Sequence, residues 1–411
     1  MQQPMFDSMP AVTPRMAPTL QAAQVLLSAV RPSAYARTRN ALDGAVTGLS
    51  PYLTHGLLSL PEVLTEIDRK HALDVQHKLV FELGWRAYFR HVWQHRGGGI
   101  LASLHEGPLP DSAYANELPV DIRTACTGVP AIDTAVHTLY ATGTLHNHAR
   151  MWLASYVVHL RKVHWRAGAD WLYGHLLDGD LASNHLSWQW VAGTGSSKPY
   201  LFNAENVARY APESWHSPGS VVDVGYDELD RVCRSPRAVH SPRSAALQAV
   251  TEPVMTRSPP HHAGLRAPDA ALVQGREVWL VHPWSLGDLP ADLPSDTVVL
   301  GLWLHDFHRA WAWSPARWAF VQTRMAELAP VQWQGSADQV AAALAAARSV
   351  RSVDEPHLAP WLPRLAECRA APALFADVPG RCDSFSKWWT RATRGLTTAA
   401  DLLATSRKAA W

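Results

Sequence analysis

Cysteine is scarce in this chain of 411 residues, and the few that occur are scattered. No CxxC pair is present, so the cysteines suggest neither a zinc ribbon nor a disulfide framework, and a reducing compartment is expected. The chain also has no run of 18 apolar residues, and its first residues lack the charged and then apolar pattern of a secretory signal. We therefore expect a cytoplasmic protein without a membrane-spanning segment. The four cysteines are Cys126, Cys233, Cys368 and Cys382.

An excess of charge of either sign is also missing. The chain has 37 Lys and Arg residues and 36 Asp and Glu residues, and its net charge is +1. Such a chain has no global field to hold nucleic acid or an anionic membrane, so a DNA partner must be held by a local patch. Apolar residues make up 47% and charged residues 18%, which excludes disorder of the whole chain and leaves a length typical of two or three domains.

The spacing of apolar residues divides the chain into four parts. Residues 1–20 hold four prolines and few large apolar side chains, and are expected to form a loose arm. In residues 21–230 large side chains recur three and four apart, which predicts an all-α domain. Residues 231–272 are rich in Pro, Ser and Arg, as is typical of a linker. Residues 273–411 alternate short apolar runs with helical patterns, which predicts a smaller, doubly wound α/β domain with a helical C-terminal extension.

The densest group of polar and aromatic residues is LDGDLASNHLSWQW, residues 177–190. If a helix starts near Asp180, Asn184 and Trp188 follow at successive turns on the same face. Spacing alone leaves two interpretations open: a capped helix with a buried tryptophan, or the wall of a functional site. A metal site is not predicted, because no third and fourth ligand lies at a recognisable spacing from Asp178 and Asp180.

Other patterns have structural explanations. His91 and His95 lie four residues apart, as metal ligands can, but no acid or cysteine completes a set, and exposed surface histidines are expected. The letters HNH at residues 146–148 are adjacent, so they cannot supply the spaced metal site of a nuclease. Trp388 and Trp389 are expected to pack in an amphipathic helix, and contact with nucleic acid is the alternative.

Several motifs then occur in one consistent order. They are GLSPYL at 48–53, FELGWRAYF at 81–89, CTGVPAID at 126–133, GTLHNHARM at 143–151, VHWRAG at 163–168, and the segment at 177–190. Together they resemble the FAD-binding helical domain of the DNA photolyase and cryptochrome family, over residues 35–212. In that family an α/β antenna domain precedes the helical domain, so the resemblance implies an exchanged domain order here.

The resemblance implies FAD as the cofactor and leaves an antenna chromophore unknown. Arg150 corresponds to the arginine that faces the isoalloxazine, Asp178 to its salt-bridge partner, and Asp180 to the acid beside the pyrimidine edge. Asn184 corresponds to the residue next to N5, where a neutral amide favours repair over signalling. The implied cofactor-binding residues are Tyr35, Thr47, Gly48, Leu49, Ser50, Arg86, Asn147, Arg150, Asp178, Gly179, Asp180 and Asn184.

The chain departs from the family pattern at three points. Residues 47–48 are Thr-Gly where the family usually has Ser-Arg, so a charge is lost near the FAD phosphates. Thr144 stands where a tryptophan commonly follows the glycine. Trp188 and Trp165 match the inner two members of the path that photoreduces the flavin, but no tryptophan stands at the outermost position, and Tyr114 is the nearest aromatic residue in sequence.

On the substrate side, the resemblance implies a wedge of Trp85 and Trp190 that stacks on a flipped cyclobutane pyrimidine dimer. Base flipping is needed because a buried flavin can reach only a base that has left the stack. Family members that act on (6-4) lesions carry histidines at the positions of Asn147 and Met151, so that specificity is disfavoured. The implied substrate-binding residues are Trp85, Glu82, Asn147, Met151 and Trp190, and the implied catalytic residues are Asn184, Trp188, Trp165 and Glu82.

The sequence therefore predicts a light-driven, FAD-dependent lyase that repairs cyclobutane pyrimidine dimers in damaged DNA. Excited reduced flavin would donate an electron to the flipped lesion, and the protein would bind, orient and exclude water. The alternative is a cryptochrome-like blue-light photoreceptor without repair activity. A third interpretation is a degenerate relative that no longer binds flavin.

Overall fold

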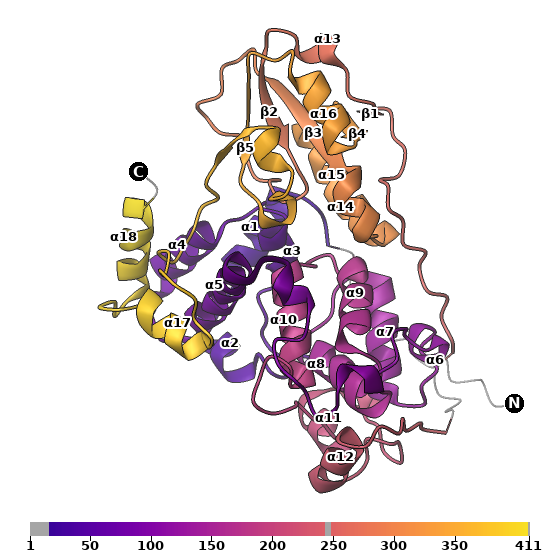
Figure 1. Ribbon diagram of the computed structural model, residues 1–411. Helices are drawn as coiled ribbons and strands as arrows, with labels where there is room; N and C mark the ends of the chain where they lie inside the picture. Colours follow the sequence, from indigo (N-terminus) through magenta and orange to yellow (C-terminus); the bar gives the residue numbers. More distant parts are fainter. Residues whose placement is uncertain (1–15, 243–247, 410–411) are drawn as a thin grey trace, which may run out of the picture.

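The computed structural model of the chain describes residues 16–242 and 248–409. Most of the expected N-terminal arm, residues 1–20, lies outside the described residues. The first helix begins at Leu20, and the first part of the chain is helical as predicted (Figure 1). Its helices are α1 (Leu20–Ser28), α2 (Pro32–Thr38), α3 (Ser50–Thr54), α4 (Leu60–His71), α5 (Lys78–Arg96), α6 (Val120–Arg123), α7 (Pro130–Thr142), α8 (Asn147–Ser155), α9 (Trp165–His175), α10 (Leu181–Ala192), α11 (Ala204–Tyr210) and α12 (Tyr226–Cys233).

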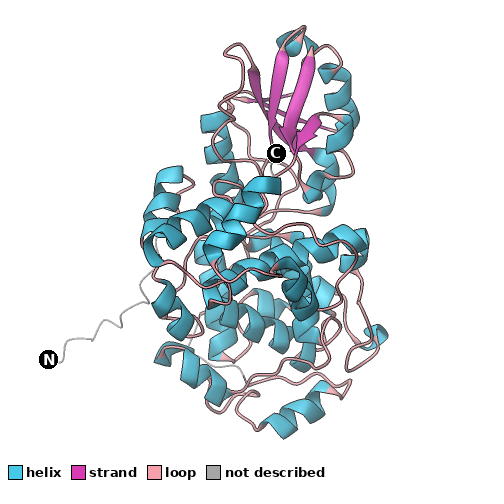
Figure 2. Cartoon of the chain, turned by 90° about the vertical axis from the view of Figure 1, so that its left-hand side faces the viewer, coloured by secondary structure: helices cyan, strands magenta, loops and turns pink. Residues whose placement is uncertain are grey.

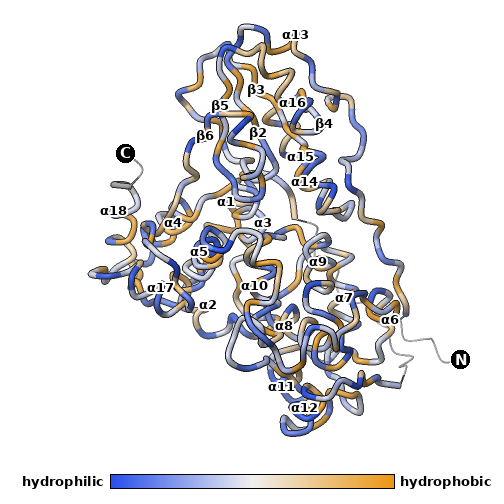
Figure 3. The backbone as a smooth tube through the Cα atoms, in the orientation of Figure 1, coloured by the Kyte–Doolittle hydropathy of each residue, from blue (hydrophilic) through white to orange (hydrophobic). Residues whose placement is uncertain are grey.

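Helix α10 lies at the centre of this part and packs on α5, α8 and α9. Its position follows from its sequence, because apolar or small side chains surround the whole helix and nearly all of them are buried. Helix α12 is the opposite case. It buries only Leu229 and Cys233, and Figure 3 shows most of it in hydrophilic colours. The residues that could form a site are therefore gathered around α10.

The second part of the chain forms a parallel sheet. The strands are β1 (Leu265–Arg266), β2 (Glu277–Val281), β3 (Val298–Leu304), β4 (Gln332–Gly335), β5 (Ser349–Val353) and β6 (Glu367–Arg369). Strands β2 and β3 are almost continuously apolar, which is typical of parallel strands covered on both faces. The helices between the strands are α13 (Ala270–Val273), α14 (His305–Ala310), α15 (Pro315–Leu328) and α16 (Ala337–Leu344). The alternation of short strands and helices predicted from the sequence is thus present.

The strand order in the sheet is β1-β4-β3-β2-β5-β6, and every adjacent pair is parallel. From β2 the chain proceeds through β3 to β4 on one side and then returns to β5 on the other side. The direction of winding therefore changes between β2 and β5. Figure 2 shows the sheet above the helical part, with the strands pointing along the long axis of the molecule.

The connection between the two parts runs along the surface of the helical part. The backbone N–H of Val239 donates to the Leu160 carbonyl, and that of Val250 donates to the Thr124 carbonyl. Glu252 accepts hydrogen bonds from the Trp171 indole and the Arg123 guanidinium. These contacts fix the segment to the helices over much of its length, although its composition is typical of a linker.

After β6 the chain returns to the helical part and ends in α17 (Phe385–Ala392) and α18 (Ala399–Ala409). Helix α17 packs on α5, and α18 packs on α4. Trp388 and Trp389 are 3% and 6% exposed, so the expected packing of these residues is confirmed. One apolar core runs without interruption through α1, α4, α5, the sheet and α17, while a second core lies under α7, α8 and α9. In the part of the chain that the structure describes, no helix is both long and apolar enough to cross a bilayer.

Candidate functional site

A cavity of about 230 Å³ opens beside α10 in the helical part. Its walls come from α3, α5, α8, α9 and α10, together with the turn that precedes α10. Its mixture of apolar and polar groups is typical of a site for an organic ligand. The lining residues are Ser50, Glu82, Arg86, Phe89, Asn147, Arg150, Met151, Ala154, Leu172, Asp178, Ser183, Asn184, Ser187, Trp188 and Val191.

An ion pair between a half-buried arginine and a buried carboxylate forms one wall of the cavity. The Arg150 Nη2 group lies 2.9 Å from both carboxylate oxygens of Asp178, and the Arg150 Nε group donates to the Leu145 carbonyl at 2.8 Å. These three bonds fix the plane of the guanidinium, because its donors have a rigid arrangement. The pairing of Arg150 with Asp178 that the resemblance implied is therefore present in the structure.

Helix α10 presents one face to the cavity, with Ser183, Asn184, Ser187, Trp188 and Val191 at successive turns. The Asn184 Nδ2 group donates to the Ala169 carbonyl at 2.8 Å, which fixes the orientation of the amide. Its side-chain oxygen remains as the acceptor that the residue can offer to a ligand.

A cation of α5 lies at the opposite wall. The Arg86 Nη2 group donates to the Thr54 hydroxyl at 2.6 Å, and burial lowers the pKa of this arginine. Glu82, one turn before it, also lines the cavity. Burial raises the pKa of Glu82, and the Arg39 guanidinium at 3.4 Å partly opposes that effect. The wall thus contains one half-buried cation and one carboxylate with a reduced tendency to ionise.

Asp180 and Gly179 do not line the cavity. Asp180 is the N-cap of α10, where its Oδ1 atom accepts from the Ser183 N–H at 2.8 Å, and its Oδ2 atom accepts from Arg90 at 2.8 Å. These contacts and the nearby charge of Arg90 hold the pKa of Asp180 far below its usual range, against the effect of burial. The Gly179 carbonyl accepts from Arg317 of α15. In the structure both residues fix the start of α10.

Ser50, the first residue of α3, lines the cavity, but the predicted residues in the segment before α3 do not. Leu49 is buried in the core, and the Thr47 hydroxyl accepts from the Leu49 N–H at 3.3 Å. Gly48 has a φ of 66°, a conformation that favours glycine over residues with a side chain. Tyr35 lies outside the cavity lining, and burial and the charge of Glu82 raise its pKa.

The predicted electron path begins at the cavity. Trp188 lines the wall, and its ring packs directly on Gly168 of α9. Trp165, three residues before that glycine, is 2% exposed, and its indole donates to the Ser103 hydroxyl. Tyr114 lies 6.3 Å from the His164 ring, which itself lies 5.6 Å from Trp165. The structure therefore places both inner tryptophans on the contact between α9 and α10.

The two tryptophans of the predicted wedge lie outside the cavity lining. Trp85 stacks on Phe385 of α17, with ring centroids 4.0 Å apart and an angle of 11° between the planes. Trp190 is 41% exposed, and its ring lies 5.7 Å from that of Tyr200. The substrate-side residues that do line the cavity are Glu82, Asn147 and Met151.

The expectation of exposed histidines on α5 is wrong for His91. This residue is buried, and its Nε2 atom accepts from the Cys382 N–H at 3.1 Å, because the C-terminal segment covers this side of α5. The described residues contain no cluster of three or more His, Cys, Asp or Glu side chains that could hold a metal ion.

Sequence reasoning missed several lining residues. Ser183, Ser187 and Val191 carry a signal that could have identified them, since they lie at helical spacing on the same face as Asn184. Phe385 carries no such signal, because it reaches Trp85 from a distant part of the chain. At residue 144 there is a threonine and not an aromatic ring. The hydroxyl and the backbone N–H of Thr144 both form hydrogen bonds with the Thr142 hydroxyl.

Comparison with known proteins matches residues 79–249 to the family described as the FAD binding domain of DNA photolyase. The deoxyribodipyrimidine photo-lyase of Streptomyces griseus is 34% identical over 152 residues, which are 37% of this chain and 33% of that protein. A cryptochrome DASH of Gloeobacter violaceus is 32% identical over 219 residues, or 51% of this chain and 42% of that protein. The chain thus spans less than half of the length of these relatives.

Among solved structures, the cryptochrome of Synechocystis sp. PCC6803 is similar to this chain, with a TM-score of 0.42 and 29% identity. The similarity covers 51% of this chain and 46% of the cryptochrome. The family match ends at residue 249, before the first strand of the sheet at Leu265.

Proposed function

We propose that this chain, whose residues 79–249 belong to the family of FAD-binding domains of DNA photolyase, binds FAD and repairs cyclobutane pyrimidine dimers in light. The observation that carries the proposal is the composition of the cavity. A paired arginine and carboxylate and a neutral amide share one cavity with the side chains expected around the lesion. The proposed reaction class is that of a light-dependent lyase acting on carbon–carbon bonds.

The chemistry of the cavity fits FAD. Ala154, Leu172 and Val191 provide apolar surface for a planar ring, and a half-buried cation, Arg86, can offset the negative charge of a ligand. Asn184 and the Arg150 pair would hold the ring edge, and the Ser50 hydroxyl would hold the phosphate side. When bound, FAD supplies the light absorption and the electron for repair.

The residues of the chain would then tune and supply this cofactor. The Asn184 nitrogen is already bonded to the Ala169 carbonyl, so its oxygen is left to accept a hydrogen bond from an N–H group of a reduced flavin. Trp188 forms part of the wall, which supports the proposal that it passes an electron to a ligand in the cavity. Trp165, at the start of α9, would replace that electron.

The proposed partner is DNA with a flipped dimer. Asn147 and Met151 are uncharged side chains on the cavity wall, which supports a dimer over a (6-4) lesion by the resemblance already described. Trp190 offers an exposed indole on which a base can stack. A cytoplasmic location stays a prediction.

A blue-light photoreceptor is the second candidate. Phe385 already occupies one face of Trp85, so that face is not open to a lesion. Relatives named cryptochrome DASH also occur beside those named photo-lyase. A protein that uses the flavin for signalling would not need a free Trp85.

The test is repair of an oligonucleotide with one thymine dimer, in light and in darkness, with bound flavin reduced chemically and its absorption band recorded in the same sample. Repair in light alone is the expected result. Flavin without repair would instead support the photoreceptor. Absence of flavin from protein refolded or purified with excess FAD would contradict both candidates.

A further inference from the structure

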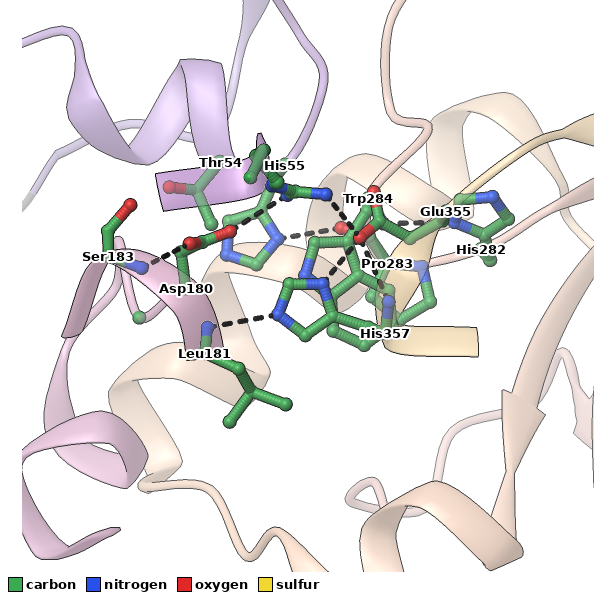
Figure 4. A network of polar contacts seen from close by, with 12 residues as sticks. Thr54, His55, Asp180, Leu181, Ser183, His282, Pro283, Trp284, Glu355 and His357 are labelled. Atoms are coloured by element: carbon green, nitrogen blue, oxygen red, sulfur yellow. Dashed lines mark hydrogen bonds and ion pairs between the residues drawn. The ribbon is translucent and has the colours of Figure 1, made fainter. Parts of the chain in front are cut away.

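The carboxyl edge of the sheet faces α10. The winding of the sheet changes direction between β2 and β5, and in open parallel sheets the loops at that edge are the usual place for a ligand. Here the loops after the two strands, residues 282–284 and 354–357, contact the helical part (Figure 4). The first does so through the Pro283 carbonyl, which lies 2.6 Å from His55, and the second through the side chains of Glu355 and His357. The edge is therefore occupied by another part of the same chain.

The tautomer of His357 follows from its contacts. Its Nδ1 atom lies 2.5 Å from the Glu355 carboxylate, which also accepts from Arg90 at 2.9 Å. Because a carboxylate with these partners accepts, Nδ1 carries the proton and Nε2 keeps a lone pair. The Leu181 N–H donates to that Nε2 atom at 3.2 Å. Burial lowers the pKa of His357, which agrees with a neutral ring.

Leu181 is the first residue of α10, and its N–H has no partner within the helix. The helix therefore has two caps: Asp180 from its own segment, which bonds the Ser183 N–H, and His357 from the sheet. Arg90 joins the two caps, because it bonds both Asp180 and Glu355. Figure 4 shows Asp180, Leu181, Glu355 and His357 meeting in one network.

We propose that Glu355 and His357 are positioning residues that set the start of α10, and through it the place of Asn184 on the cavity wall. The α/β domain thereby acts on the site through a helix end and not through a ligand of its own at this edge. The functional consequence rests on the proposed binding of FAD, but the cap itself does not.

The first test uses the full chain without cofactor. His357→Leu removes the acceptor at similar volume, and we expect hydrogen exchange of the Leu181 amide to become about fivefold to tenfold faster. His357→Gln keeps one acceptor and one donor, and should restore most of the protection. His308→Leu is the matched control, because His308 is equally buried but bonds the Trp311 carbonyl instead of an amide of α10. Nitrogen NMR of His357 in the wild-type chain should report a proton on Nδ1.

The second test adds FAD and records its absorption band and reduction potential. The expected result is a shift in His357→Leu that His357→Gln reverses and His308→Leu does not produce. Unchanged exchange at Leu181 in His357→Leu, or equal acceleration in the two leucine variants, would overturn the cap. Faster exchange without any shift of the bound flavin would overturn the positioning role. If FAD does not bind, the proposed function fails while the exchange result still decides the cap.

Discussion

At the scale of single residues, the cavity depends on side chains that are fixed by backbone groups of neighbouring helices. The Asn184 Nδ2 group on α10 donates to the Ala169 carbonyl of α9, and the residue is 9% exposed. An aspartate at this position could accept but not donate, and its charge would face a carbonyl oxygen. Asn147 lines the same cavity but its side chain is exposed, so it provides a control position for the effect of burial at Asn184.

We therefore expect Asn184→Asp to lower the free energy of unfolding by about 1–3 kcal/mol, the cost of leaving a buried group unsatisfied. Asn147→Asp, the same chemical change on the exposed side, should change it by less than about 0.5 kcal/mol. Urea denaturation of the chain without cofactor measures both values. An equal loss in the two variants would contradict the assigned role of the Ala169 contact.

Trp190 carries a prediction about DNA. It is 41% exposed and lies outside the cavity lining, so its ring is available to a base but not to the cofactor. Trp190→Ala should weaken binding of a dimer oligonucleotide about tenfold or more, because loss of one stacked base costs about 1–3 kcal/mol. Binding is measured by fluorescence anisotropy, and the flavin band should stay unchanged. Tyr226→Ala, an exposed aromatic on α12, is the control, and loss of flavin from Trp190→Ala would show that the residue is misplaced.

At the scale of elements, the contact between α9 and α10 is set by a glycine. A Cβ atom at Gly168 would lie 2.3 Å from the ring of Trp188, which is closer than packed atoms allow. The absence of a side chain at this position lets the two helices approach and lets the indole reach the cavity wall. Gly98 has no neighbouring atom within 4 Å of an added Cβ, so it provides a glycine without this constraint.

Gly168→Ala should therefore lower the free energy of unfolding by about 1–3 kcal/mol, as overpacking of a core commonly does. It should also change the near-ultraviolet circular dichroism of the tryptophans, because Trp188 must move. Gly98→Ala should leave both quantities nearly unchanged. A stable Gly168→Ala variant with an unaltered spectrum would contradict the close contact between Gly168 and the Trp188 ring.

Helix α10 also shows how far local spacing can lead. The predicted start near Asp180 is confirmed, and Asn184 and Trp188 do share one face. Asp180 itself does not join that face, because an N-cap side chain turns back to the helix amides. The contacts of Phe385 and His357 could not be predicted, since each depends on the tertiary return of a segment that is distant in sequence.

At the scale of the whole molecule, several histidines are buried in neutral form. Burial lowers the pKa of His308 to about 3, and that of His146 and His159 to about 4. In the unfolded chain these groups bind protons below their usual pKa of 6.5, whereas the folded chain keeps them neutral. The unfolded state thus binds more protons as the pH falls, and the folded state loses stability.

We expect the free energy of unfolding to decrease steeply below about pH 6.5, with each of these groups contributing up to about 1.4 kcal/mol per pH unit. Glu355, whose pKa is lowered to about 2 by Arg90 and His357 against the effect of burial, adds a further loss on acidification below its usual pKa of 4.5. Guanidinium denaturation at about pH 7.5 and about pH 5.5 measures the first effect. Equal stability at the two values would contradict neutral burial. His159→Gln, which removes one titrating group, should make the dependence shallower.

The return of α17 to α5 has a consequence for synthesis. The Trp389 indole donates to Gln76, 313 residues earlier, and its ring fills the space beside Gly84. At a synthesis rate of roughly 5–20 residues per second, α5 must wait tens of seconds on the ribosome for its covering helix. During that interval Phe81 and Trp85 lack their partner Phe385, so the nascent chain exposes an aromatic surface of the kind that chaperones bind. The helical part is therefore the first to be made and among the last to be completed.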